Sequence, residues 1–276
     1  MRLLLASLPD AASVNIMERL QEAADWEEVG DFHAKPVLRN GSSVMTSMDL
    51  LHLSADDVDK DLTSSTGIEI EEIVFLSKHK AASGIRTLTV HPIGNYGKAE
   101  FGGREGELVK SSPSTMTGLL RGLATNSAGL PFKVSYEVTH HGPWLSTPSV
   151  FIEIGSGEGD WGHEGAAAAI AKSILELQRA EGPVVVGIGG GHYAPRFTEI
   201  SFSRKVAFGH MIPIYAIEEA SDASATAMML KATKASGTDM IYVHRKSMSG
   251  AKAKRLKELA TSAGLRTVES EDLEPL

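Results

Sequence analysis

Short apolar runs that suit buried strands alternate along the chain with longer segments whose apolar residues recur at helical spacing. The expected strands cover residues 2–7, 44–53, 70–76, 87–90, 134–138, 149–154, 184–188, 240–243 and 266–268. The expected helices cover residues 11–24, 115–128, 164–180, 220–235 and 251–263. This alternation predicts an α/β fold, with a mixed, mostly parallel sheet that carries helices on both faces.

The clearest helix is the alanine-rich segment 164–180, because alanine is the strongest helix former. It lies between the strands at 149–154 and 184–188, which predicts a parallel β-α-β crossover. No low-complexity linker or internal repeat divides the sequence. We therefore expect one domain over residues 1–276, with inserted loops near 25–65 and 96–112.

Composition limits the chemistry. The 276 residues include 27 basic and 35 acidic side chains, a net charge of −8, which argues against nucleic-acid binding by the whole surface. A local basic patch that positions an RNA end stays open. The chain has no cysteine, which excludes disulfides, thiolate nucleophiles and iron–sulfur clusters. Any metal must be bound by histidine, carboxylate or water.

The N-terminal apolar stretch is short and leads into Asp10 without a convincing cleavage site, so a buried first strand fits it better than a signal peptide. No run approaches the ~20 apolar residues that a transmembrane helix needs. We expect a cytoplasmic protein that does not contact membranes.

One segment combines strand residues, glycines and reactive side chains. The apolar run at 184–188 ends at Gly189, Gly190 and Gly191, and His192, Tyr193 and Arg196 follow. The loop does not match GxGxxG, because His192 replaces the last glycine, and it lacks the Lys-Ser/Thr of a phosphate-binding P-loop. Pro195 argues against a helix that begins at once. Loop amides that hold an oxyanion or phosphate stay open as an alternative.

Histidines recur just after the expected strands. Seven of the ten lie between positions 79 and 210, and most follow a strand directly: His79, His91, His140, His141, His163, His192 and His210. Histidine is the usual side chain for proton transfer near neutral pH and a common metal ligand. For any one histidine alone a structural or surface role is favoured, but their recurrence at strand ends predicts one shared functional site.

Two carboxylates fall inside strand-like runs. Glu153 has apolar neighbours on both sides, and burying a carboxylate is costly unless it is paired. Such a group suits a general base or a metal ligand, whereas simple alternation would point it at solvent. Glu137 raises the same question with weaker support.

Six segments together resemble the archaeal and plant type of D-aminoacyl-tRNA deacylase: residues 77–79, 88–95, 138–143, 149–156, 187–197 and 209–213. The resemblance implies hydrolysis of the ester that joins a D-amino acid to the tRNA 3′ end. It also implies a zinc requirement and a fold related to peptidyl-tRNA hydrolase and nucleoside phosphorylases. Two positions depart from the family pattern, with Lys78 in place of arginine and Ile93-Gly94 in place of Pro-Gly. Lys78 keeps the charge but loses the planar fork of arginine.

The residues suggest a mechanism. We hypothesise that zinc bound by His79, His140, His141 and His192 lowers the pKa of a bound water. His192, Glu153 and His141 form the expected catalytic set, in which Glu153 orients the water or takes its proton. The amides of Gly189, Gly190 and Gly191 would stabilise the oxyanion. Lys78, Tyr193 and Arg196 complete the expected substrate contacts, with the two cations on tRNA phosphates.

Three alternatives remain open at this point. The 2′-hydroxyl of the terminal adenosine would assist the attack without a metal. A nucleoside-processing enzyme of phosphorylase type would use the same glycine loop. A non-catalytic module would bind an RNA end or a metal only. We expect a monomer that acts on the aminoacylated tRNA 3′ end and has no DNA partner.

Overall fold

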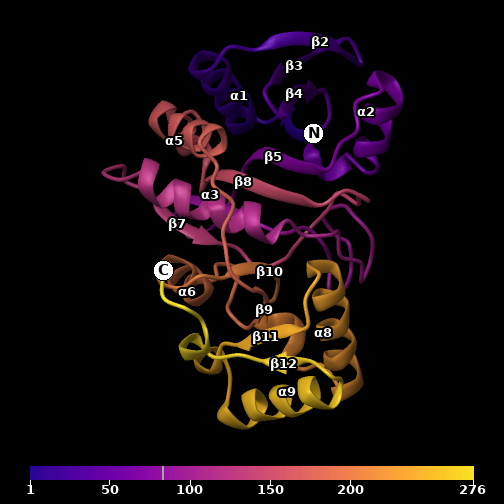
Figure 1. Cartoon of the computed structure of the whole chain (residues 1–276), viewed down its shortest axis with the longest axis vertical. Coiled ribbons are helices and arrows are strands. Elements are labelled where there is room, and N and C mark those ends of the chain that lie inside the picture. Colours follow the sequence, from indigo (N-terminus) through magenta and orange to yellow (C-terminus); the bar gives the residue numbers. More distant parts are fainter. Residues whose placement is uncertain (83) are drawn as a thin grey trace.

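Two β-sheets form the framework of the computed structural model, which describes residues 1–82 and 84–276 (Figure 1). The first sheet has the strand order β2-β3-β4-β1-β5-β8-β6-β7, and the second has the order β10-β9-β11-β12. The strands are β1 (Arg2–Ser7), β2 (Glu27–Phe32), β3 (Lys35–Asn40), β4 (Ser43–Met48), β5 (Glu72–Lys78), β6 (Thr87–His91), β7 (Lys133–Tyr136), β8 (Ser149–Gly155), β9 (Val184–Ile188), β10 (Ala207–Ile212), β11 (Met240–Val243) and β12 (Arg266–Thr267).

Helices cover both sheets. They are α1 (Ala11–Ala23), α2 (Val58–Thr66), α3 (Pro113–Asn126), α4 (Glu158–Trp161), α5 (Glu164–Leu175), α6 (Pro195–Ser203), α7 (Ile214–Ile217), α8 (Asp222–Ser236) and α9 (Gly250–Ser262). Within the described residues, no helix has the length and apolar character needed to cross a bilayer.

The first sheet is buried on both faces because its side chains alternate between two hydrophobic clusters. On β1, Leu4 and Ala6 join the cluster under α1, α3 and α5, whereas Leu3 and Leu5 join the cluster on the other face, with α2. Successive strand residues point to opposite faces, so one apolar run supplies both cores.

The second sheet continues this packing. One face, with Ile188 and Ile241, packs against α8 and α9. From the opposite face, Phe208 joins the cluster that also contains Leu119 of α3 and Val90 of the first sheet. A continuous core therefore connects the two sheets, which lie at opposite ends of the view in Figure 1.

The expected α/β class is confirmed, with helices on both faces and mostly parallel pairing. All pairs in the second sheet are parallel, as are β4–β1, β1–β5, β5–β8 and β6–β7 in the first. β6 pairs with β8 in the antiparallel direction, and β2, β3 and β4 form an antiparallel edge.

Three expectations about elements were wrong. Residues 25–65 are not an inserted loop, because they form the edge strands β2–β4 and helix α2. The expected β-α-β crossover fails because β8 and β9 lie in different sheets. Helix α6 does begin at Pro195, since proline's fixed φ and missing N–H suit the first helical turn.

The segment 96–112 contains no named helix or strand, as expected, but it is not a simple surface loop. Leu108 and Val109 near its end are buried. Gly102 and Gly103 pack closely against Gly142, and a Cβ on Gly142 would lie 2.1 Å from the Gly103 amide nitrogen. Only glycine permits this approach, which brings the segment against the residues that follow β7.

Candidate active site

The candidate site lies on the face of the first sheet that carries Phe75 and Phe151. Alternation along β5 carries the same face from Phe75 through Ser77 to His79, and along β8 from Phe151 to Glu153. In the register of the sheet, Glu153 lies between Ser77 and Thr89, and His91 lies beside Phe151. Strand alternation therefore turns Glu153 into a covered face and not toward solvent.

The second sheet contributes His192 through the glycine loop. The Val138 amide donates to the carbonyl oxygen of His192 at 3.0 Å, and the Ala194 amide donates to Tyr136 at 2.9 Å. These bonds fasten the loop after β9 to the residues that continue β7. Two segments that belong to different sheets thus form one wall of the site.

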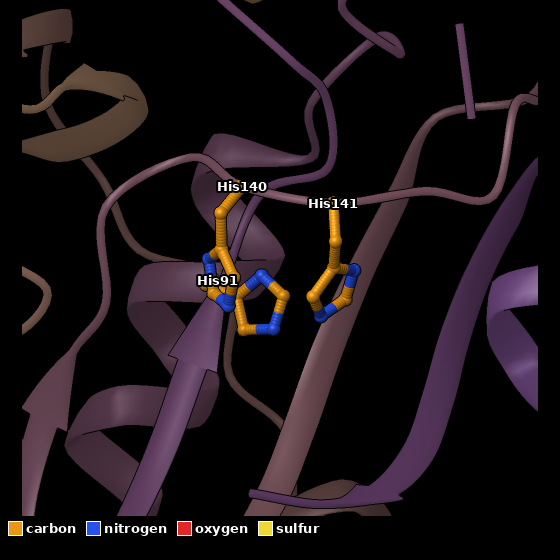
Figure 2. Close-up of side chains that lie close together, drawn as sticks. All are labelled: His91, His140 and His141. Atoms are coloured by element: carbon orange, nitrogen blue, oxygen red, sulfur yellow. The ribbon is translucent and has the colours of Figure 1, made fainter. Parts of the chain in front are cut away.

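Three histidines converge in a way that suits a metal ion (Figure 2). One ring nitrogen each of His91, His140 and His141 lies within 4.8 Å of the others. The Nδ1 atoms lie 3.2, 2.8 and 2.6 Å from the carbonyl oxygens of Pro92, Val138 and Gly142, respectively. A carbonyl only accepts, so in the neutral rings Nδ1 carries the proton and Nε2 keeps its lone pair. Backbone bonds of this kind orient histidine ligands in metal sites.

His141 also has an unusual backbone. Its φ is +41°, in the left-handed region that favours glycine. Such strain persists where the surroundings fix the conformation, and here the amide of the next residue, Gly142, donates to the Phe101 carbonyl at 3.0 Å. The 96–112 segment therefore helps to hold the His141 ring in place.

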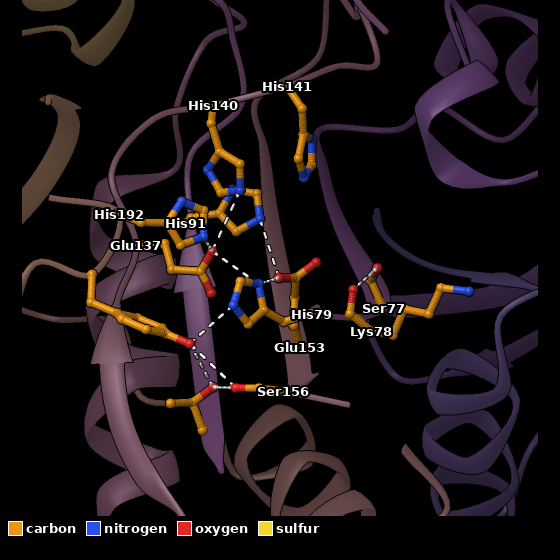
Figure 3. Close-up of polar contacts among 12 residues, drawn as sticks. Ser77, Lys78, His79, His91, Glu137, His140, His141, Glu153, Ser156 and His192 are labelled. Atoms are coloured by element: carbon orange, nitrogen blue, oxygen red, sulfur yellow. Dashed lines mark hydrogen bonds and ion pairs between the residues drawn. The ribbon is translucent and has the colours of Figure 1, made fainter. Parts of the chain in front are cut away.

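Glu137 is the buried anion of the site, with no solvent exposure. Its Oε2 lies 2.8 Å from Nε2 of His192, 3.3 Å from Nδ1 of His79 and 3.4 Å from Nε2 of His140 (Figure 3). Apart from these histidine contacts, no group among the described residues donates to either carboxylate oxygen. Because an unpaired buried anion is costly, the histidines are the groups that compensate this carboxylate.

His79 connects this anion to the second carboxylate. Its Nδ1 lies 3.7 Å from Oε2 of Glu153, which in turn lies 3.6 Å from Nε2 of His91. On the other side of the ring, Nε2 of His79 lies 3.0 Å from the hydroxyl of Tyr193. His79 therefore stands between two carboxylates and a phenol, and Figure 3 shows it at the centre of this network.

Burial and charge move the pKa values of the two carboxyls in opposite directions. Burial disfavours the Glu137 anion, but the surrounding histidines, with His192 first, outweigh it and hold the pKa well below the usual range. Burial, assisted by the Glu137 charge, raises the pKa of Glu153 despite the nearby histidines. Burial likewise lowers the pKa of His140 and His141, which favours their neutral, metal-binding form.

A pocket of about 250 Å³ opens beside these groups. Six of the residues expected in the site line it: Lys78, His79, His140, His141, Glu153 and His192. Tyr193 contacts His79 from behind the pocket. The structure therefore brings His79, His140, His141 and His192 together, whereas His163 caps α5 and His210 lies between Thr139 and Val109.

Other expected contacts are placed differently. The Gly189 amide already donates to Ile212 at 2.8 Å, which removes it from the expected oxyanion donors. Lys78 lines the pocket, but its Nζ lies 4.8 Å from the centre of the Trp161 ring and extends away from the histidines in Figure 3.

Arg196 lies apart from the histidines, in a separate pocket of about 840 Å³. Its guanidinium binds Glu199 at 2.9 Å, the Tyr242 hydroxyl at 3.2 Å and the Ser270 hydroxyl at 3.1 Å. The structure therefore does not bring Arg196 together with the other expected site residues. Helix α6 carries this side chain toward the ends of β9 and β11.

Two functional candidates were missed or underrated from the sequence. His91 was counted among the strand-end histidines but not chosen as a ligand, and Glu137 received less weight than Glu153. The signal for His91 was present, because it ends β6 just as His79 follows β5. Nothing local to Glu137 could show that three histidines would surround it.

The fold and site define an α/β protein with a buried histidine–carboxylate centre that suits hydrolytic chemistry. The family model for D-aminoacyl-tRNA deacylase matches residues 66–268. A D-aminoacyl-tRNA deacylase of Methanococcoides burtonii is 38% identical over 98% of this chain, and one of Methanosarcina mazei is 36% identical over 98%. The chain belongs to the D-aminoacyl-tRNA deacylase family.

Coverage and structure agree with this assignment. The alignment spans 57% of the Methanococcoides burtonii protein and 92% of the Methanosarcina mazei protein. A crystal structure of a conserved protein of unknown function superposes with a TM-score of 0.88 at 35% identity, covering 99% of this chain and 96% of that one. The expected fold therefore has a close match among solved structures.

Proposed function

We propose that this chain hydrolyses the ester bond of D-aminoacyl-tRNA and releases a free D-amino acid and tRNA, with His192 as the group that takes the proton of the attacking water. The observation that carries this role is the 2.8 Å approach of His192 Nε2 to the buried Glu137 carboxylate. His192 is 40% exposed and lines the pocket, so water and substrate reach it, whereas Glu137 is sealed behind it.

The His192–Glu137 pair has the arrangement of other histidine–carboxylate catalysts. A buried carboxylate orients the imidazole and stabilises the imidazolium that forms when the ring accepts a proton. Glu137 also contacts His79 and His140, so the charge that develops on His192 is shared within a network. We assign Glu137 to this positioning role. Glu153 lines the pocket and faces His91 and His79.

The residues fit a zinc ion. We propose that His91, His140 and His141 hold it through Nε2, because the backbone carbonyls engage Nδ1 of each ring. When bound, zinc would supply Lewis-acid polarisation and a water of lowered pKa. His79 and His192, the other expected ligands, form a second possible metal-binding group with Glu137. We propose that these two histidines hold and move protons beside Glu137.

The remaining groups position the substrate. The amides of Gly190 and Gly191 are left to stabilise the oxyanion, since Gly189 is already engaged. Lys78 and Lys80 line the pocket without an acidic partner among the described ion pairs, and their positive charge favours a negatively charged substrate beside the histidines. The expected monomeric state and cytoplasmic location stay predictions.

One assay tests the proposal. Purified protein should deacylate D-tyrosyl-tRNA much faster than matched L-tyrosyl-tRNA, and chelation should abolish the activity while elemental analysis reports bound zinc. Equal rates on the two substrates would contradict the proposed selectivity. Activity that survives complete removal of metal would instead favour assistance by the 2′-hydroxyl. Phosphate-dependent release of a base from a nucleoside would favour the phosphorylase-type alternative.

A further inference from the structure

His140 and His141 separate two pockets. On one side lies the 250 Å³ pocket described above, and on the other lies a pocket of about 240 Å³ lined by Asn95, Tyr96 and Tyr215, among others. Both pockets include the two histidines and Phe101 in their walls. A group that reacts at the histidines can therefore extend into either pocket.

The second pocket carries two exposed aromatic rings. Phe101 is 66% exposed and Tyr215 is 63% exposed, although large aromatic side chains normally bury most of their surface. The two rings come from distant segments, one from the 96–112 segment and the other from α7. An aromatic pair that lines one pocket is the usual platform for a flat ring system, above all a nucleobase.

Phe101 is held in place despite its exposure. Its carbonyl accepts the Gly142 amide at 3.0 Å, directly after His141. The Asn95 side chain donates to the carbonyls of Gly102 and Arg104 at 3.0 and 3.3 Å, which fixes the turn after Phe101. The backbone that carries the ring is therefore fixed beside the histidines, and such preorganisation lowers the entropic cost of binding.

The polar groups of the pocket favour a neutral, hydrogen-bonding ligand. Lys98 and Glu100 both line it, so their charges offset each other. Asn95 and Tyr215, which also line the pocket, carry neutral polar groups that suit hydrogen bonds to the edge of a base.

We infer that this second pocket, with Phe101 and Tyr215 as its stacking surface, binds the terminal adenosine of the tRNA, while the pocket beside Glu153 receives the aminoacyl group. The inference rests on the proposed function. It assigns the two halves of the ester to the two sides of His140 and His141, so the scissile bond lies at the histidines. The other pocket suits the aminoacyl half because Leu51, Leu53 and Phe151 give it an apolar side.

The test uses Phe101→Ala, Tyr215→Ala and the double variant, with D-tyrosyl-tRNA as substrate and adenosine 5′-monophosphate as a competitor. Loss of one stacked ring should raise KM about tenfold to a hundredfold and leave kcat within about twofold, because the rings bind ground state and transition state alike. The nucleotide should inhibit the wild type and fail to inhibit the double variant.

Controls separate stacking from misfolding. Phe202→Ala removes an exposed phenylalanine on α6 outside both pockets and should leave KM unchanged. Phe101→Trp and Tyr215→Phe keep the aromatic face and should retain the KM of the wild type. An unchanged KM in the double variant, or an altered preference among D-amino acids with intact nucleotide inhibition, overturns the assignment.

Direct titration of the nucleotide by calorimetry separates this inference from the proposed function. If the wild type binds the nucleotide through the two rings yet never deacylates D-tyrosyl-tRNA, the proposed reaction is wrong and the subsite stands. If it deacylates D-tyrosyl-tRNA but the nucleotide binds neither protein, the subsite is wrong and the reaction stands.

Discussion

The histidine pocket and the Arg196 pocket lie at the ends of different sheets and differ in how their polar groups are satisfied. The Arg196 pocket is the larger, at about 840 Å³ against 250 Å³, but Arg196 binds Glu199, and Lys257 binds Glu269. In the histidine pocket, Glu137 and Nε2 of His91 are buried without a hydrogen bond among the described residues. Unsatisfied buried groups cost stability, so they mark function better than volume does.

The sharpest test of this contrast removes the histidine–carboxylate pair. His192→Ala and Glu137→Gln should each lower kcat for D-tyrosyl-tRNA about a hundredfold to ten-thousandfold, because the water loses its proton acceptor or that acceptor loses its orientation. Single-turnover deacylation measures this. His244→Ala, a histidine of the Arg196 pocket, is the matched control and should keep full activity. A fully active His192→Ala would remove His192 from the catalytic set.

Metal content tests the three-histidine group independently of turnover. His141→Ala should lose most of the bound zinc in elemental analysis, because two histidines alone leave the tetrahedral site incomplete. His33→Ala is the control, since His33 is 66% exposed and pairs with Asp61 away from the pocket. Equal zinc content in both variants would place the metal elsewhere, for example on His79, Glu137 and His192.

A buried histidine outside the catalytic set gives a pH effect on stability. Burial lowers the pKa of His210 from 6.5 to about 4, because its ring is enclosed between Thr139 and Val109. The unfolded chain binds this proton first, so folding stability should fall as pH drops from about 6.5 to 4, by about 3 kcal/mol for this group. Urea unfolding at pH 7 and 4.5 measures it.

His210→Gln supplies the reference for that measurement. The variant should start less stable at pH 7 but lose less stability in acid than the wild type does. An identical acid dependence in both proteins would mean that His210 is not the group responsible.

The smallest effect is expected at the other pocket. Arg196→Ala should change KM for D-tyrosyl-tRNA by less than about threefold and the free energy of unfolding by about 1 kcal/mol, because its partner Glu199 is 68% exposed and solvent screens the ion pair. Steady-state kinetics and urea titration check both values. A tenfold or larger rise in KM would mean that tRNA also contacts the Arg196 pocket, and the functional difference between the two pockets would not hold.

Local features of the molecule were predictable from the sequence. The apolar run at 184–188 is β9 with the same bounds, and 240–243 is β11, because short apolar runs encode buried strands. The convergence of His79, His140 and His192 also followed from their positions after strands. These features depend on residues within a few positions of one another.

Features that depend on how the elements assemble were not predictable. Periodicity does not reveal that β6 runs antiparallel to β8, although this register places His91 beside Phe151 and brings its Nε2 to 3.6 Å from Oε2 of Glu153. The role of Glu137 depends on a loop arriving from another sheet. Arg196 was assigned to the site because it is four residues from His192, but α6 turns it toward a different pocket. Closeness in sequence therefore did not predict closeness in space for these two residues.

The glycine loop after β9 belongs to the second sheet but contributes His192 to a site on the first sheet. The complete site therefore forms only when both sheets have packed together. The strands of the first sheet and the residues that follow them supply His79, both carboxylates and the three proposed zinc ligands His91, His140 and His141. Only docking of the second sheet adds His192, through the bonds to Tyr136 and Val138. A partly assembled chain would therefore store metal without cleaving esters, and hydrolytic activity would appear last during folding and disappear first during denaturation.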